Sequence, residues 1–302
     1  MKIISSALIP LVVAGILGTG CGSRPSPIDQ ATVNAQHASV RTRNSSDSRT
    51  LMVLEPGDHV EILEQRERWY RIRLGDLEGW MEASFLLPDS VRDRMQENIE
   101  SARDQAPQNT GVLSQAGNLR IEPGRTTAVL RRLPARTAVE VLERKSLPRT
   151  DLPGRVDAWL KVRTGPSEVG WLLSTFVEFD VPDGIAPYTE GYTYTAVKVL
   201  NQVADPVAGT VRWYVVGERR PGVDPTVDFE GIRVYTWNSR RQRYETAFRQ
   251  SGLRGIYPIE VGQNAGRPTF RIHELDADGK TRRTKDYVMN GVNVRELKSD
   301  GD

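Results

Sequence analysis

The sequence is poor in residues that form covalent or metal cross-links. Its 302 residues include one cysteine, Cys21, and three histidines. A chain with a single thiol cannot form an internal disulfide, so its stability must come from hydrophobic cores. The length is enough for two or three such cores, and 38% hydrophobic and 26% charged residues are ordinary for a soluble globular protein.

Catalytic and cofactor-binding motifs are also missing. His37, His59 and His273 are scattered, and there is no HExxH zinc motif, GxSxG nucleophile elbow or P-loop. The lone thiol of Cys21 lies in an N-terminal signal-like segment, which leaves no cysteine nucleophile for a peptidase. Residues 275–280, LDADGK, begin like a calcium loop but lack its later ligands, so we expect a hairpin turn there. We therefore predict no metal, no cofactor and no enzymatic activity.

The residue types that are present do not exclude one class of hydrolytic site, that of the glycosidases. Glycosidases use a pair of carboxylates, and Glu218, Asp228 and Glu230 are candidates in the C-terminal third of the chain. An enzyme of this kind should have a deep pocket with converging acids within residues 190–297.

A strong excess of charge of either sign is absent. The sequence has 41 lysines and arginines against 39 aspartates and glutamates, so we expect no nucleic acid partner. The basic stretches 240–243 and 280–285 lie at or beside predicted hairpin tips, where charge discourages edge-to-edge aggregation of sheets. Binding of an anionic polymer or of lipid headgroups by these stretches is the alternative.

Residues 1–20 have the pattern of a secretory signal peptide. Lys2 precedes an apolar run that is short for a membrane-spanning helix and is interrupted by Pro10. Cys21 follows Leu-Gly-Thr-Gly, which resembles the lipobox of bacterial lipoproteins except that a glycine takes the usual place of a leucine. The resemblance implies that Cys21 is acylated and anchors a lipoprotein of the cell envelope, facing the periplasm or the cell surface. Cleavage by an ordinary signal peptidase, with release of a soluble protein, is the alternative.

The rest of the chain alternates between strand-like and helical stretches. Short alternating stretches are separated by turn signals such as Pro56-Gly57-Asp58, whereas residues 89–105 lack glycine and proline and space Val91, Met95 and Ile99 by four. This spacing predicts a linker helix. The expected parts are a lipidated N-terminus and tether at 21–35, a first β domain at 36–88, a helical linker at 89–109, a second β domain at 110–180, and a β-rich C-terminal domain at 190–297.

One phrase occurs twice. WYRIRLGDLEGW, residues 69–80, corresponds to WLKVRTGPSEVGW, residues 159–171, and the flanking sequences correspond as well. The repeated unit resembles the bacterial SH3-like domain family, through features such as Val40-Arg41 and Phe85-Leu86 in the first copy and Leu119-Arg120 in the second. The resemblance implies two tandem small barrels. The expected fold class is therefore mainly β, with two SH3-like barrels joined by a helical linker and a C-terminal antiparallel β-sandwich or barrel.

The repeated phrase also supplies the candidate ligand contacts. Side chains of a strand alternate between its two faces, so Trp69 and Arg71 share a charged face, as do Trp159 and Lys161. We expect the two tryptophans to be partly exposed and to contact a ligand together with these cations. The alternative is that each tryptophan covers the edge of its barrel or stacks on an arginine. The second tryptophans of the phrase complete the set, which is Trp69, Arg71, Trp80, Trp159, Lys161 and Trp171.

Three hypotheses of function follow. In the first, the chain is a non-enzymatic envelope lipoprotein whose SH3-like modules bind a peptide or peptidoglycan, and it acts as an adaptor or scaffold. In the second, it is an envelope enzyme, a cell-wall hydrolase, whose catalytic domain lies in residues 190–297. In the third, the modules bind nothing and the protein is structural or regulatory. The first is the one that we predict.

Overall fold

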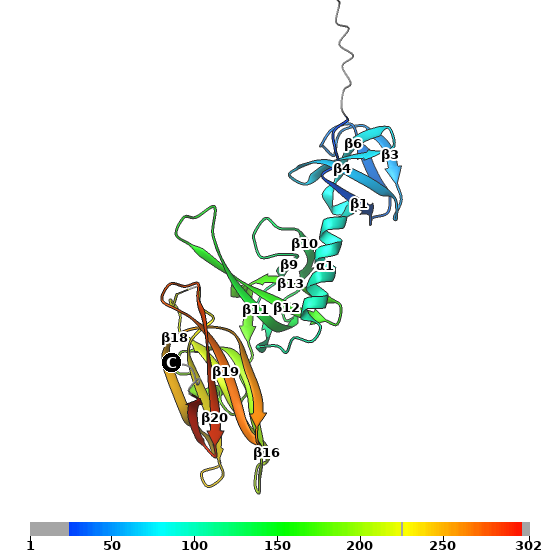
Figure 1. Cartoon of the computed structure of the whole chain (residues 1–302). Helices are drawn as coiled ribbons and strands as arrows, with labels where there is room; N and C mark the ends of the chain where they lie inside the picture. The colour runs from blue at the N-terminus through cyan, green and yellow to red at the C-terminus, as the bar shows by residue number, and fades with distance from the viewer. Residues whose placement is uncertain (1–23, 225, 298–302) are drawn as a thin grey trace, which may run out of the picture. The chain divides into compact units, whose positions relative to one another are not determined.

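The structure is a computed structural model that describes residues 24–224 and 226–297, and these ranges are mainly β (Figure 1). Their strands form three antiparallel sheets of seven strands each, and one α-helix, α1 (Asp89–Ala102), follows the first sheet in the sequence. The chain divides into two compact units, the first ending at Ser90 and the second beginning at Val91. No helix in the described ranges is long and apolar enough to cross a membrane. The predicted signal peptide and Cys21 lie outside the described residues.

The first sheet has the strand order β3-β2-β6-β5-β4-β1-β7. Its core contains Val60, Ile62, Ile72 and Met81, which alternate with outward-facing neighbours. At the predicted turn before β4, Gly57 has a φ of 98°, which favours glycine. The elements are β1 (Asp29–Val33), β2 (Ala38–Arg41), β3 (Thr50–Leu54), β4 (His59–Arg66), β5 (Trp69–Leu74), β6 (Leu77–Glu82), the 3-10 helix η1 (Ala83–Phe85) and β7 (Leu86–Pro88).

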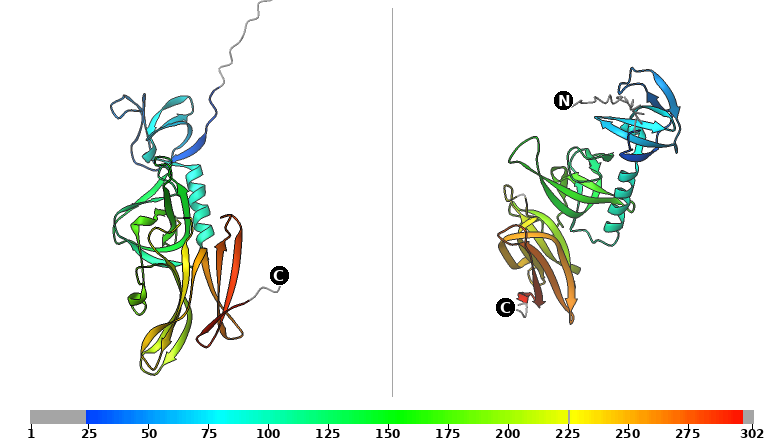
Figure 2. Two further views of the ribbon diagram at one scale, coloured as in Figure 1. Left: turned by 90° about the vertical axis from the view of Figure 1, so that its left-hand side faces the viewer. Right: turned by 45° about the horizontal axis from the view of Figure 1, so that its top comes forward.

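The predicted helix forms and ends three residues earlier than expected, at Ala102. Its residues Ile99 and Ala102 pack against Leu142 and Val169 of the second sheet, and Nδ2 of Asn98 donates a 2.9 Å hydrogen bond to the carbonyl of Ile121. The two views of Figure 2 show α1 running alongside this sheet.

The second sheet has the order β10-β9-β13-β12-β11-β8-β14, which is the order of the first sheet with each strand replaced by its counterpart. Leu119, Leu133, Val141 and Leu160 are fully buried in its core. Residues 149–155 connect the two longest strands of this sheet. The elements are β8 (Asn109–Leu113), β9 (Gly117–Arg120), β10 (Val129–Leu133), β11 (Ala138–Pro148), β12 (Val156–Gly165), β13 (Glu168–Leu173), the 3-10 helix η2 (Ser174–Phe176) and β14 (Val177–Phe179).

The third sheet is a meander whose strands follow the order of the chain. All seven strands are hydrogen-bonded in one sheet, and β15 comes close to β18 and β19 as well as to its neighbour β16. Both predicted hairpins form, after Asn238 and around Asp278-Gly279. The elements are the 3-10 helix η3 (Ala186–Tyr188), β15 (Thr193–Asp205), β16 (Gly209–Arg219), β17 (Phe229–Asn238), β18 (Arg243–Asn264), β19 (Arg267–Leu275), β20 (Arg282–Asn290) and β21 (Asn293–Leu297).

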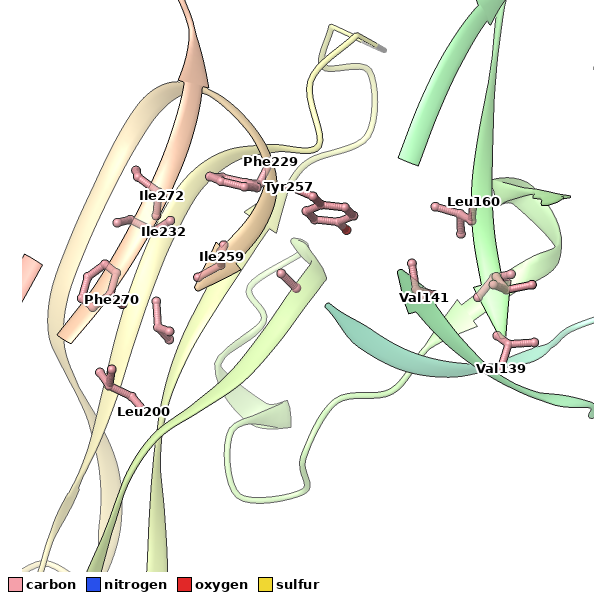
Figure 3. Packing of buried hydrophobic residues seen from close by; sticks show 14 of the residues in the cluster. Val139, Val141, Leu160, Leu200, Phe229, Ile232, Tyr257, Ile259, Phe270 and Ile272 are labelled. Carbon is pink, nitrogen blue, oxygen red and sulfur yellow. The ribbon is translucent and has the colours of Figure 1, made fainter. Parts of the chain in front are cut away.

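The second and third sheets share one hydrophobic cluster. Figure 3 shows Tyr257 between Phe229 of the third sheet and Leu160 and Val141 of the second, and all four residues belong to this cluster. Burial of this apolar surface stabilises the two sheets as one body.

Polar groups reinforce the same junction. The side-chain oxygen of Gln108 accepts a hydrogen bond from the backbone N–H of Ile259 at 2.8 Å, and Nδ2 of Asn109 donates to the carbonyl of Tyr194 at 2.8 Å. The largely buried side chains of Arg144 and Asp228 form an ion pair across the junction at 3.2 Å.

Candidate functional site

A hollow of about 410 Å³ lies on the first sheet beside strands β4 and β5. Glu61 and Arg73 occupy paired positions on these strands, and Nε of Arg73 donates to the Glu61 carboxylate at 2.6 Å. A second nitrogen of Arg73 donates to the carbonyl of Pro25 at 3.1 Å, which fixes the segment that leads into β1. Arg24, Gln30 and His59 complete the polar lining.

The second sheet carries a hollow of about 450 Å³ in the corresponding place. Nε of Arg163 donates to the Glu140 carboxylate at 2.6 Å. Its other nitrogens donate to the carbonyl of Ala102 at 2.7 Å and to that of Gln105 at 3.3 Å. As in the first sheet, the arginine therefore holds the segment that precedes the first strand.

Strand register makes the two hollows equivalent. Val60 pairs with Ala31 of β1, as Val139 pairs with Gly111 of β8, so the flanking positions of the two hollows correspond residue for residue. The corresponding lining residues are Gln30 and Thr110, His59 and Ala138, Glu61 and Glu140, and Arg73 and Arg163. Each hollow therefore has an arginine and a carboxylate at the same place. Together they offer a hydrogen-bond donor and a hydrogen-bond acceptor, which is what the C=O and N–H groups of a peptide require.

The two hollows differ in polarity. His59 in the first hollow corresponds to Ala138 in the second. The turn between β5 and β6 contains Asp76, and the corresponding turn between β12 and β13 contains Pro166. Arg24, which is paired with Asp76 at 2.8 Å, also lines the first hollow. The first hollow therefore offers more charge, and the second more apolar surface.

The predicted exposure of Trp69 and Trp159 is wrong, because each is only 3% exposed. In β12 the four consecutive residues from Trp159 to Val162 are all buried, so this strand is covered on both faces. At Lys161 the covering element is α1: its residue Ser101 accepts a hydrogen bond from Nζ of Lys161 at 2.8 Å on the face that we expected to be solvated. The assignment of the two tryptophans as ligand contacts stays a prediction, but little of their surface is available.

The other predicted contacts are also occupied by neighbours. Arg71 pairs with Glu78 at 2.7 Å, and the guanidinium of Arg66 lies over the ring of Trp80 at 5.5 Å. Lys161 and Trp171 are 7% and 6% exposed. Burial lowers the pKa of Lys161 below its usual value.

None of the six predicted contact residues lines either hollow. Sequence reasoning missed Glu61, Arg73, Glu140 and Arg163, although a signal for them was present. The stretches HVEIL and AVEVL, residues 59–63 and 138–142, repeat a glutamate, and an arginine follows the isoleucine or valine of the tryptophan phrase in both copies.

Each of the candidate catalytic carboxylates is paired with an arginine. Glu218 is fully buried and lies 2.9 Å from both Arg233 and Arg249. Glu230 pairs with Arg220 at 2.8 Å, and Asp228 pairs with Arg144. Burial raises the pKa of Asp228, while the backbone N–H of Tyr257 and the cation of Arg144 act in the opposite direction.

These carboxylates do not line the two hollows. Within the described ranges no three His, Cys, Asp or Glu side chains are grouped as a metal site requires. The buried acids can therefore neutralise arginines and order the surrounding loops.

Comparison with known proteins identifies part of the chain. Residues 37–86 match the bacterial SH3 domain family. This bacterial SH3 domain runs from the start of β2 to the start of β7 and includes His59, Glu61 and Arg73 of the first hollow. No curated protein matches the chain.

Two solved structures from Trichomonas vaginalis align with most of the chain. NlpC2 is 12% identical over 91% of this chain and 100% of its own, and NlpC1 is 13% identical over 95% and 99%. Both have a TM-score of 0.19, which is too low to carry an argument about fold or activity.

Proposed function

We propose that the chain is a non-enzymatic cell-envelope protein that binds a peptide or peptidoglycan ligand through two SH3-like modules, with the two hollows as the binding sites. The observation that carries this proposal is the equivalent hollow in both sheets, one of which lies on the bacterial SH3 domain. Volumes of about 410 and 450 Å³ are those of sites for small ligands or short peptide segments.

We infer that the second sheet is a second SH3-like module. Its support is the shared strand order, the shared register around the hollow, and the repeated arginine–glutamate pair. In this proposal α1 is the linker between the modules, and the third sheet is an interaction or structural domain attached to the second module.

Attachment to the envelope belongs to the same proposal. Its support is the signal-like residues 1–20 and the lipobox-like sequence before Cys21, both of which lie outside the described residues. Two modules on one anchored chain would bind a repeating polymer more tightly than either module alone, because the second binding event becomes intramolecular.

A non-enzymatic role accounts for the acids of the third sheet. Glu218 binds Arg233 and Arg249, while Asp228 and Glu230 each bind one other arginine, so we interpret the three acids as structural counter-charges. We therefore favour an adaptor or scaffold over a cell-wall hydrolase.

Binding of the full chain to purified peptidoglycan sacculi tests this function. Arg73→Gln removes the cation that is paired with Glu61 in the first hollow. We expect binding to be weaker by about tenfold, which corresponds to the loss of one charge-assisted hydrogen bond to the ligand. Arg71→Gln is the matched control, because Arg71 lies two residues away on the same strand and does not line the hollow. Equal binding by both variants, or no binding by the folded wild type, would overturn the proposal.

A further inference from the structure

A third hollow, of about 380 Å³, lies at the junction of the second and third sheets. Three arginines line it, Arg144 from β11 and Arg219 and Arg220 from the end of β16. Ser174, Thr175, Thr193 and Thr195 are also part of the lining, and the hydroxyl of Thr195 donates to the carbonyl of Asp228 at 3.0 Å. The hollow is separate from the two equivalent ones.

The charges around this hollow do not balance. Its lining contains Arg144, Arg219, Arg220 and the single acid Asp157. Within the described residues, the ion-pair partners of this lining that lie just outside it are Asp228, Glu230 and Arg125. Together they are four arginines against three carboxylates, an excess of one positive charge. Arg254 and Asp224, which pair with each other nearby, leave this excess unchanged.

Arg219 carries the unbalanced charge. Its guanidinium donates hydrogen bonds to the backbone carbonyls of Val223, Asp224 and Val227, and within the described residues it has no ion pair with a carboxylate. Arg144 donates to the same carbonyl of Val227 at 2.8 Å, so two guanidinium groups meet at one oxygen. Burial, with a smaller contribution from Arg144, lowers the pKa of Arg219. A bound anion would relieve this unfavourable concentration of positive charge.

The remaining wall of the hollow is apolar. It includes Val156, Leu160, Val177 and Phe179 of the second sheet and Pro221 after β16. A ligand that places an anionic group at the arginines would therefore also contact apolar side chains in the same hollow.

We propose that this hollow binds a monoanionic carboxylate with an apolar body, such as the free C-terminus of a peptide. The geometry that carries the proposal is an arginine, Arg219, that has no carboxylate ion pair within the described residues and that lines the same hollow as several apolar side chains. A carboxylate matches the planar fork of an arginine and supplies one negative charge. Inorganic phosphate would bring more charge than the excess and no apolar body, so it should bind more weakly.

Isothermal titration of the full chain with acetyl-dialanine and with its C-terminal amide tests the charge requirement. We expect saturable binding of the acid and binding of the amide that is weaker by about tenfold, because only the acid has the charge. Inorganic phosphate should bind more weakly than the acid. Equal binding of acid and amide, absence of acid binding, or tighter binding of phosphate would overturn the proposal.

Thr175 provides a matched pair of variants, because it lines the hollow and its side chain is exposed, so neither change should affect folding. Thr175→Glu places a fixed carboxylate in the hollow and should weaken acid binding by about tenfold. Thr175→Gln adds the same volume without charge and should weaken it far less. Equal losses would show that charge does not matter and would contradict the proposal.

A third titration separates this site from the two equivalent hollows. In a double variant that carries His59→Trp and Ala138→Trp, the affinity for acetyl-dialanine should be unchanged, because neither residue lines this hollow.

Discussion

Arg73 and Arg163 illustrate how single residues shape the proposed binding sites. Each joins a glutamate on the neighbouring strand to a backbone carbonyl of the segment before the first strand of its sheet. Charge-assisted hydrogen bonds of this kind are short and directional. The arginine therefore fixes the floor of the hollow and at the same time presents a cation to it.

Burial of Trp159 leads to a prediction about stability. Trp159→Ala should lower the free energy of unfolding by about 3–5 kcal/mol, because it leaves a large cavity in a packed region. The measurement is urea unfolding followed by far-ultraviolet circular dichroism. Lys145→Ala, a change to the residue that pairs with Trp159 across the sheet, serves as the control and should cost much less. A loss below about 1 kcal/mol for Trp159→Ala would show that the ring lies at the surface.

Alternation along β5 and β12 was a poor guide to these tryptophans. The period of two separates the faces of a strand correctly: Ile72 and Val162 are buried in the cores. It does not say what lies on the second face. In β12, α1 covers Lys161 and Arg163 on that face, through their hydrogen bonds to Ser101 and to the carbonyl of Ala102. Such a contact joins segments about 60 residues apart, and no local pattern in β12 contains it.

At the scale of elements, turn chemistry and helical spacing were the reliable signals. The turn at Gly57, the hairpins near Asn238 and Asp278, and the helix from Asp89 are all present. Each depends on a few neighbouring residues, which is why the sequence predicts them. The hollows require the register of three strands at once, and the junction of the second and third sheets requires long-range packing. Neither could be derived from local patterns.

Lys161 tests the contact between α1 and β12. Its ammonium group is buried, its pKa is lowered by that burial, and its one described hydrogen bond is to Ser101. Lys161→Met keeps the length of the side chain and removes the charge, so we expect the free energy of unfolding to stay the same or rise by about 1 kcal/mol. Chemical denaturation at neutral pH measures this. A large loss would mean that the charge itself holds the helix in place.

The same lysine predicts a pH dependence. Because its folded-state pKa lies below the unfolded value of about 10.4, the unfolded chain binds more protons in the alkaline window between the two values. The stability contributed by Lys161 should therefore rise with pH across that window. The difference in stability between Lys161→Met and the wild type should shrink there.

At the scale of the whole molecule, the second and third sheets behave as one body in their packing. They share a hydrophobic cluster, a buried ion pair between Arg144 and Asp228, and hydrogen bonds from Gln108 and Asn109. The first sheet belongs to a separate compact unit. Cooperative unfolding follows units that share a core.

Differential scanning calorimetry should therefore show two unfolding transitions rather than three. The core variant Ile72→Ala should shift only the transition of the first unit, by the several degrees that a loss of about 2–5 kcal/mol implies. Leu200→Ala, in the third sheet, should lower the midpoint of the other transition without splitting it, because the second and third sheets unfold together. Three independent transitions would show that the junction does not couple the two sheets.

Filling both equivalent hollows tests whether they bind the envelope ligand. His59→Trp and Ala138→Trp place bulky side chains at corresponding exposed positions in the two hollows. The measurement is co-sedimentation with purified sacculi of four proteins: the wild type, each single variant and the double variant. Circular dichroism first establishes that all four are folded. We predict a partial loss of affinity in each single variant and a loss of about a hundredfold in the double variant, since each hollow contributes separately. Sedimentation of the double variant equal to that of the wild type would show that the two hollows are not the binding sites.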